Sequence, residues 1–399
     1  MPVANEGVLT LTIAMRVSPD GSAGVELLKN YRSALNYAIN KILSMNLRTV
    51  KDVHRALYRE LVERFNLPSR VAIDCYRDAL ANAKAWRRNP RKGRRPVKRL
   101  SMLLNKDYGY RVRDGYVEII GGVKLRVVGW DRRYDCYPSG DARLTYKDGK
   151  MVLWVSKMIP KPESYTPRDV IGVDVNEEKI VYGDEVINEE KGTKISRAER
   201  FKLLAELLQK KYSSPRYQAW KRRRGILNRI RAFYRKTRNI LEDNARKVAH
   251  EIVMTAKRLG YAVAREDLTG LRESLRRLPK NHRTRLLLLG YARIEKWIDW
   301  QALKHGVPRV VVNARNTSSE CPKCDHVGLE EVGYRRLRCP RCGFEADRDQ
   351  IGKLNIRKRA LRMLKLPGGA LTPPTAPQMT DVAPNRWGEP MNRPRDPCP

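Results

Sequence analysis

Alternating apolar and polar positions begin the chain, and residues 7–16 have the period of two that predicts a β-strand. Helical spacing of apolar residues follows at about 24–45, 50–65 and 68–86. Strand-forming residues then return in two predicted hairpins, at 116–128 and at 143–155, each with a glycine-containing turn. Residues 1–165 are therefore predicted to form a small β-barrel with a helical insert at about 20–105.

A second pattern begins after a proline-containing linker at 160–167. Predicted strands alternate from here with helical segments, which indicates an α/β domain interrupted by a basic helical pair and a cysteine-rich module. The strands are expected at 169–176, 179–183, 261–265 and 307–312, and the helices at about 195–258, 284–305 and 349–365. The tail, residues 366–399, is rich in Pro, Gly and Asn and is predicted to be disordered.

The charge of the chain indicates the kind of partner it has. There are 82 Lys and Arg against 44 Asp and Glu, a net charge of +38. Such an excess repels itself unless a polyanion neutralises it, and we expect that polyanion to be nucleic acid. Anionic membrane is the competing partner, but no run approaches the roughly 18 to 20 apolar residues that span a bilayer. Because the first residues also lack a secretory signal, we expect a cytoplasmic, nucleoid-associated protein with no membrane partner.

Two segments concentrate the positive charge. Residues 86–99 carry eight cations and no acid, and Pro and Gly prevent this stretch from continuing the preceding helix. A flexible polybasic strip can follow a nucleic-acid backbone without reading its sequence, and a solvated loop is the alternative. The second strip begins at 221, inside the basic helical pair. The candidate nucleic-acid contacts are Arg87, Arg88, Arg91, Lys92, Arg94, Arg95, Lys98, Arg99, Arg222, Arg223 and Arg224.

Four of the seven cysteines lie within residues 321–342. Cys321 and Cys324 form one Cys-x-x-Cys pair, and Cys339 and Cys342 form a second one after fourteen intervening residues. This spacing supplies four thiolates for a tetrahedral zinc ion and leaves no position for water, so a structural Zn²⁺ is predicted. Two disulfides or a rubredoxin-like iron site are the alternatives.

Three acidic residues stand next to predicted core segments. Asp174 lies inside an apolar strand, Glu266 directly follows the strand 261–265, and Asp349 lies at the start of the last helix. A lone Asp in a strand is costly unless it is paired or binds a cation. In phosphodiester hydrolysis, clustered carboxylates hold two divalent ions about 4 Å apart, and hard oxygen ligands suit Mg²⁺ or Mn²⁺. Each acid alone also has a structural explanation, as a turn cap, a strand end or a first-turn residue of a helix.

Taken together, these segments resemble the TnpB (OrfB) family of insertion-sequence proteins, the relatives of type V CRISPR effectors. Ile171-Gly172-Val173-Asp174 is similar to the first RuvC motif of this family, and Arg265-Glu266-Asp267-Leu268 is similar to the second. Residues 316–324 are similar to the Thr-Ser segment that leads into the family's zinc ribbon, and residues 342–356 to the third motif, which ends in Asn355-Ile356. The likeness covers most of residues 168–360.

The resemblance implies both a fold and a domain order. The expected fold class is α/β plus β-barrel: an RNase H-like RuvC domain with inserted helices and a zinc ribbon, preceded by an N-terminal β-barrel with a helical insert. The N-terminal barrel, the wedge, would occupy residues 1–165, with a recognition insert at about 20–105. The nuclease domain would occupy 166–315 and 345–365, the ribbon 316–344 and the tail 366–399.

The resemblance also implies that Asp174, Glu266 and Asp349 are metal-binding catalytic acids. Of the neighbouring pair Asp347 and Asp349, the family pattern aligns Asp349 with the catalytic position. The chain departs from that pattern just afterwards, with Ile351 in place of Asn and with Gly352 and Lys353 in place of two Ala. None of these departures removes a metal ligand.

The implied function is an RNA-guided DNA endonuclease of transposon origin. Its cofactors would be Mg²⁺ or Mn²⁺ at the nuclease site and a structural Zn²⁺. Its partners would be a noncoding guide RNA from its own locus, target DNA and an accessory transposase of the same element. The alternative is a catalytically impaired RNA-guided DNA-binding protein that acts as a repressor. A structural RNA-binding protein would explain the charge and the zinc, but not the three acids in order.

Overall fold

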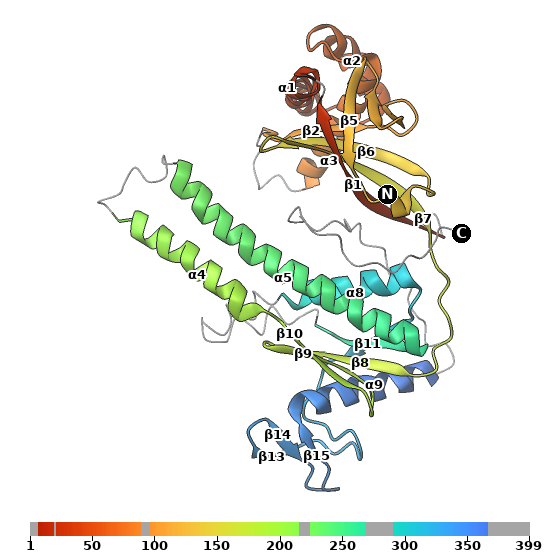
Figure 1. The fold of residues 1–399 in the computed structure, drawn as a ribbon, viewed down its shortest axis with the longest axis vertical. Helices are drawn as coiled ribbons and strands as arrows, with labels where there is room; N and C mark the ends of the chain where they lie inside the picture. Colours follow the sequence, from red (N-terminus) through yellow and green to blue (C-terminus); the bar gives the residue numbers. More distant parts are fainter. Residues whose placement is uncertain (1–6, 20, 89–95, 215–223, 269–289, 366–399) are drawn as a thin grey trace. The chain divides into compact units, whose positions relative to one another are not determined.

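The computed structural model describes residues 7–19, 21–88, 96–214, 224–268 and 290–365 (Figure 1). The chain forms two compact units and passes from the first to the second between Pro160 and Lys161. No helix among the described residues has the length and apolar character needed to cross a lipid bilayer. The tail 366–399, predicted to be disordered, lies outside the described residues.

The first unit is built on a seven-stranded antiparallel sheet, with the strand order β2-β6-β7-β1-β5-β4-β3. Along the first strand, every second side chain is buried from Leu9 to Val17, as a sheet with one covered face requires. The strands are β1 (Val8–Pro19), β2 (Leu100–Leu104), β3 (Tyr110–Arg113), β4 (Tyr116–Ile119), β5 (Val123–Gly129), β6 (Ser139–Lys147) and β7 (Lys150–Pro160).

This sheet curls until its two edges come close together. The edge strands β2 and β3 are joined by residues 105–109 only. On β3, the Tyr110 hydroxyl donates a hydrogen bond to the Gly140 carbonyl of β6, 2.7 Å away. The sheet is therefore nearly closed, and the predicted combination of a barrel-like part with an α/β part is confirmed at this level.

Three helices lie between β1 and β2 in the sequence: α1 (Ala23–Ser44), α2 (Val50–Glu63) and α3 (Ser69–Arg88). α1 and α3 pack on the sheet, and α2 packs mainly on α3. Their positions coincide with the helical spacing in the sequence. On α1, Leu28, Tyr31, Leu35 and Ile42 lie on one face and are fully or almost fully buried, in the same core as the sheet residues. A short helix, η2 (Arg132–Tyr134), follows β5.

The second unit contains a five-stranded sheet with the order β10-β9-β8-β11-β12. In this sheet β11 is parallel to both of its neighbours, and the other pairs are antiparallel. The strands are β8 (Val170–Val175), β9 (Lys179–Gly183), β10 (Asn188–Gly192), β11 (Ala262–Asp267) and β12 (Arg309–Asn313).

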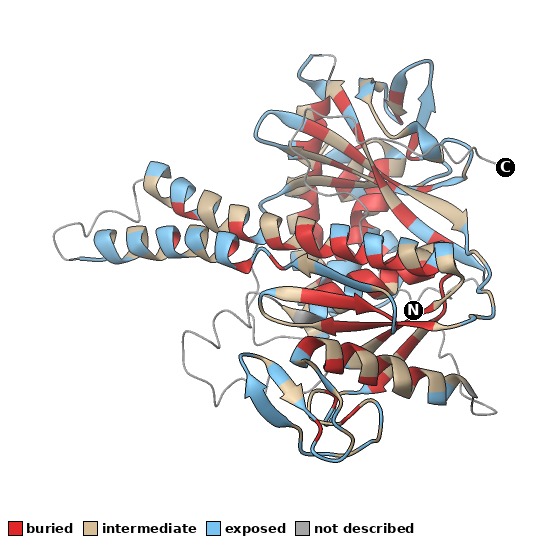
Figure 2. Cartoon of the chain, turned by 60° about the horizontal axis from the view of Figure 1, so that its bottom comes forward, coloured by how far each residue is buried: buried red, intermediate tan, exposed pale blue. Residues whose placement is uncertain are grey.

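Helices cover both faces of this sheet (Figures 1 and 2). α5 and α8 pack on one face, α9 packs on the other, and the sheet residues between them are largely buried. α4 lies beside the first part of α5, which explains the long basic helical region predicted at 195–258. The helices are α4 (Ile195–Tyr212), α5 (Arg224–Leu259), α8 (Tyr291–His305) and α9 (Arg348–Lys365).

The cysteine-rich module is inserted between β12 and α9. It contains a three-stranded antiparallel sheet with the order β13-β14-β15. These strands are β13 (Glu330–Gly333), β14 (Arg336–Arg338) and β15 (Glu345–Asp347). Because β15 runs directly into α9, the module is joined to the start of that helix without a linker.

α9 packs against β8 at a position that only glycine can occupy. A β-carbon on Gly172 would lie 2.2 Å from the backbone oxygen of Lys353 and 3.1 Å from the amide nitrogen of Arg357. Both contacts are to helix backbone, which cannot rotate away. The glycine in the first RuvC-like motif therefore sets the distance between the helix and the strand.

Gly172→Ala is accordingly expected to destabilise the second unit by about 1 to 3 kcal/mol, because α9 must shift away from β8. Thermal unfolding of the purified chain measures this as a fall in Tm of several degrees. Gly225→Ala is the matched control, because Gly225 lies in α5 with no atom near the added carbon, and alanine favours a helix. Equal Tm values for the two variants would contradict the close packing of α9 on β8.

Candidate active site and metal centre

The acids at 174 and 266 lie side by side at one edge of the five-stranded sheet. Asp174 is near the end of β8, and Glu266 is near the end of β11. These strands are parallel and are paired up to Val173 and Arg265, the residues just before the two acids. Parallel neighbours end at the same edge of a sheet, so the register brings both carboxylates there.

The start of α9 brings the third acid to the same place. Asp349 is the second residue of this helix. One turn further, Gly352 lies against the Asp174 carboxylate, where an added β-carbon would be 2.9 Å from Oδ2. The departure from the family pattern at position 352 therefore leaves space beside the first acid.

Asp174 is 7% exposed, and its carboxylate accepts a hydrogen bond from Asn176 Nδ2 at 2.7 Å. Burial raises the pKa of Asp174 to about 7, against the opposing effect of this hydrogen bond. The negative charges of Glu266 and Asp349 contribute to this rise in the pKa, after burial. The three acids are thus close enough to interact electrostatically.

Asp349 is held by cations of the protein itself. It is 1% exposed, and Arg335 Nη2 lies 2.5 Å from Oδ1 and 2.6 Å from Oδ2. Lys179 Nζ, from the first residue of β9, lies 3.5 Å from Oδ2. The neighbouring Asp347 has a different task, since its Oδ1 accepts the backbone N–H of Asp349 at 2.8 Å and so caps the start of α9.

Glu266 is held by a hydroxyl group. The side chain of Thr317, in the segment between β12 and the cysteine-rich module, donates to Glu266 Oε1. Burial raises the pKa of Glu266, and the Thr317 hydrogen bond and the charge of Arg359 act in the opposite direction. Each of the three acids therefore has its own protein partner in this conformation.

In this conformation the oxygen atoms of the three carboxylates are not all close enough together to bind one metal ion. Within the described ranges, the four cysteines are the only group of three or more potential metal-binding residues whose ligand atoms all lie within 4.8 Å of one another. Each acid instead contacts a different side-chain partner: Asn176 for Asp174, Thr317 for Glu266, and Arg335 with Lys179 for Asp349.

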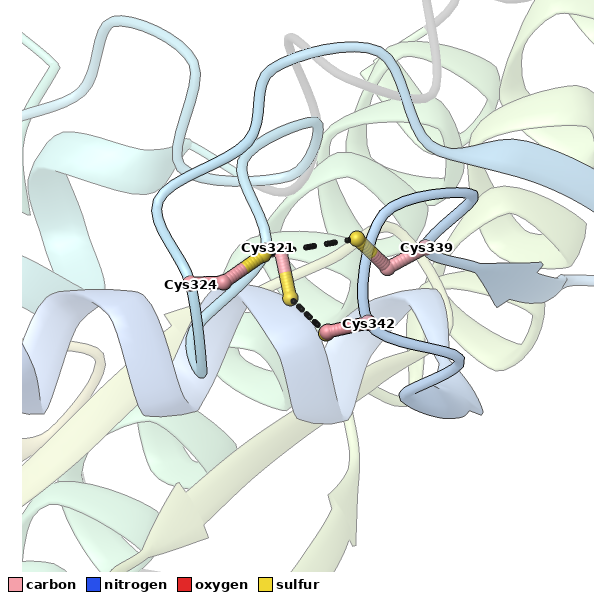
Figure 3. A group of neighbouring side chains, drawn as sticks. All are labelled: Cys321, Cys324, Cys339 and Cys342. Atoms are coloured by element: carbon pink, nitrogen blue, oxygen red, sulfur yellow. Dashed lines mark hydrogen bonds between the residues drawn. The ribbon is translucent and has the colours of Figure 1, made fainter.

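The four cysteines converge from two turns of the inserted module (Figure 3). The Sγ atoms of Cys321 and Cys342 are 3.6 Å apart, as are those of Cys324 and Cys339, and all four thiols are free. A tetrahedral zinc ion with Zn–S bonds of about 2.3 Å requires S···S distances of about 3.8 Å. This donor set therefore fits a zinc ion, and free thiols at this separation do not fit two disulfides.

Three residues beside the acids were not singled out from the sequence: Lys179, Thr317 and Arg335. The Thr-Ser segment stands out in the sequence only through the resemblance to the family, which implies no role for its threonine. For Arg335 the sequence offers no signal, because it is one of many cations in a basic chain. Only the fold shows that these side chains contact carboxylates.

Of the predicted nucleic-acid contacts, the structure describes the side chains of four. Arg88, Lys98 and Arg99 are exposed. Arg87 is half-buried, and its guanidinium donates to the carbonyl of Ile42, in the last turn of α1, and to that of Leu47, just beyond the helix. The other predicted contacts, or their side chains, lie outside the described residues: Arg91, Lys92, Arg94, Arg95, Arg222, Arg223 and Arg224.

Known proteins are similar to this chain in sequence, over part of its length, and in fold. Residues 291–356 match the family described as "Cas12f1-like, TNB domain". The TnpB-like protein MJ0751 of Methanocaldococcus jannaschii is 26% identical over 227 residues, which cover 54% of this chain and 79% of that protein. The TnpB-like protein L79 of Acanthamoeba polyphaga mimivirus is 26% identical over 149 residues, or 36% of this chain and 27% of that protein.

Two solved structures are similar in fold. The Cas12f1 protein in a complex with sgRNA and target DNA has a TM-score of 0.57 at 15% identity, covering 84% of this chain and 82% of that one. The mini RNA-guided endonuclease CRISPR-Cas_phi3 has a TM-score of 0.55 at 11% identity, covering 89% and 93%. The fold is therefore that of the compact type V effectors, with mixed α/β content and a nearly closed sheet. The resemblance seen in the motifs is confirmed by this similarity to TnpB-like proteins and to the Cas12f1-like TNB domain.

Proposed function

We propose that the chain is an RNA-guided DNA endonuclease of transposon origin, with Asp174, Glu266 and Asp349 as its catalytic acids. The observation that carries this proposal is that β8, β11 and α9 bring three carboxylates to the same edge of the sheet. Their mutual repulsion contributes to the raised pKa of Asp174, and a bound cation would relieve it. Guide RNA and target DNA are the partners of the similar Cas12f1 protein.

The donor set fits a hard divalent cation, because all three ligands are carboxylates. When bound, Mg²⁺ or Mn²⁺ would activate a water molecule and stabilise the leaving oxygen in phosphodiester hydrolysis. The protein's own part is to hold the three carboxylates in place at the sheet edge. Arg335 and Lys179 must also give up Asp349 before its carboxylate can serve as a ligand.

The four cysteines, in this proposal, hold a structural zinc ion. All four ligands are sulfur, so no position is left for a reacting water. The zinc would fix the module that carries Arg335 and leads directly into α9. The exposed cations Arg88, Lys98 and Arg99 would contact nucleic-acid backbones, in keeping with the net charge of +38.

The further partners follow from the family relationship and are part of the proposal. The guide would be a noncoding RNA from the chain's own locus, and an accessory transposase of the same element would act beside it. The protein would work at the nucleoid. The proposed domains are a wedge at 1–165, a nuclease domain at 166–315 and 345–365, and a ribbon at 316–344.

A second candidate function is a guided DNA-binding protein that does not cut and acts as a repressor. The observation in its favour is that Arg335 and Lys179 already neutralise Asp349. Because cationic side chains of the protein already balance the negative charge of Asp349, this carboxylate does not need a metal ion to be stable in its buried position.

A cleavage experiment separates the two functions. The chain, purified with RNA from its own locus, is incubated in Mg²⁺ with a plasmid library that carries guide-matched targets beside randomised flanking sequences. We expect cuts at matched targets next to one short flanking motif, and no cuts in EDTA or with Asp174→Ala. Sequencing of the cut ends identifies that motif. Specific target binding without cuts, by the chain and by Asp174→Ala alike, would exclude the endonuclease and leave the repressor.

A further inference from the structure

Thr317 contacts the second acid directly. It is 3% exposed, and its hydroxyl donates to Glu266 Oε1. The Ala314 carbonyl lies 3.0 Å from the same hydroxyl oxygen. A hydroxyl has one proton, and the ionised carboxylate is the stronger acceptor. The contact is therefore a charge-assisted hydrogen bond across 51 residues of sequence.

The backbone around Thr317 is fixed by α9. Asn355, which is 1% exposed, donates from Nδ2 to the Thr317 carbonyl at 2.8 Å and to the Glu320 carbonyl at 2.6 Å. Arg359, one turn further, donates to the carbonyls of Asn313 and Arg315 at 2.6 and 2.7 Å. Thr317 is thus held on a rigid segment, and its hydroxyl has a defined direction.

The backbone of Glu266 is fixed from the other side. Arg265 Nη1 donates to the Glu266 carbonyl at 2.9 Å, and the same guanidinium binds Glu295 and Asp299 of α8. Arg265 therefore sets the end of β11 but does not touch the Glu266 carboxylate. Among the described residues, Thr317 donates the hydrogen bond to that carboxylate.

We propose that Thr317 is a positioning residue, held by Asn355, which occupies Glu266 Oε1 so that Oε2 is directed to a divalent cation. This inference rests on the proposed nuclease function. Under this inference, the Thr-Ser segment and the Asn-Ile end of the third motif have the same role, which is to orient the Glu266 carboxylate. Both serve the carboxylate of the second motif. Hydrogen bonds of this kind to a metal ligand typically affect metal affinity 10- to 100-fold.

Three substitutions test the inference. Thr317→Val keeps the shape of the side chain and removes the hydroxyl, whereas Thr317→Ser keeps the hydroxyl. Thr237→Val is the matched control, because Thr237 is also a buried threonine, 5% exposed, whose hydroxyl binds the carbonyls of Ala198 and Phe233 away from the acids. Mn²⁺ binding to the full-length, zinc-loaded chain is followed by electron paramagnetic resonance, with Asp174→Ala defining the signal of the site.

We expect Thr317→Val to weaken Mn²⁺ binding about 10- to 100-fold, with Thr317→Ser and Thr237→Val close to the unsubstituted chain. In the guide-loaded complex, the Mg²⁺ concentration for half-maximal cutting should rise by a similar factor while target binding is unchanged. Equal Mn²⁺ affinity of Thr317→Val and the unsubstituted chain, or an equal loss in Thr317→Ser or Thr237→Val, would overturn the inference and leave the proposed function standing. If the unsubstituted chain binds no more Mn²⁺ than Asp174→Ala, the proposed metal site itself is wrong.

Discussion

Asp349→Asn is expected to reduce cutting of a guide-matched target by at least about 10³-fold while leaving guided binding of that target intact. The amide keeps the size of the side chain but loses the negative charge that a divalent cation needs. A metal ion contributes several kcal/mol to stabilisation of the transition state, and each 1.4 kcal/mol, roughly, is a factor of ten in rate. Single-turnover cleavage rates in Mg²⁺, together with gel-shift titrations of the same complexes, measure both quantities.

Asp347→Asn is the matched control, two residues away. Asp347 accepts the backbone N–H of Asp349 through its side-chain oxygen, and an Asn side chain retains an oxygen that can do the same. We therefore expect Asp347→Asn to cut within a few-fold of the unsubstituted chain. A reversed result, with Asp347→Asn inactive and Asp349→Asn active, would move the catalytic role to Asp347.

Cys339→Ser is expected to remove the zinc ion and unfold the inserted module. Structural zinc sites in small domains contribute apparent free energies of about 10 to 16 kcal/mol, more than a module of this size can replace by packing. Elemental analysis should show one zinc per chain before substitution and almost none afterwards. Limited proteolysis should then cut within 321–342.

Cys75→Ser controls for the loss of a buried thiol as such. Cys75 is a free and fully buried cysteine of α3, as buried as Cys339, but it belongs to the first unit. Its substitution should leave both the zinc content and the proteolytic pattern of 321–342 unchanged. A full equivalent of zinc in Cys339→Ser would contradict a four-cysteine site.

The sequence predicted those elements that have a strong apolar period. β1 and α1 bury every second residue and every third or fourth residue respectively, so each period was visible without a structure. β10 could not be predicted in this way, because Asn188–Gly192 contains no apolar side chain and is a strand only through its backbone pairing with β9. The short strands of the cysteine-rich module are mostly exposed and have the same difficulty.

The candidate site divides along a similar line. The four cysteines could be predicted because their spacing is local. The three acids could be proposed only because the segments around them resemble the family's motifs. Thr317 and Arg335 act through contacts with residues 51 and 14 positions away. Nothing in the neighbouring sequence marks such a contact, so these partners became visible only in the folded chain.

The ion pair between Arg335 and Asp349 would couple cation binding at the proposed site to the position of the turn between β13 and β14. Arg335 follows the exposed Tyr334 at the turn between β13 and β14, with φ at +60°, and its side chain reaches back to the acid. At the proposed metal site, this guanidinium and a divalent cation would compete for the same carboxylate, so their binding would be thermodynamically linked. A movement of the turn away from Asp349 would then raise the affinity of the site for the cation, and the bound cation would weaken the Arg335–Asp349 ion pair by the same factor. By this reciprocity, the cation content of the chain in solution reports on the position of the turn.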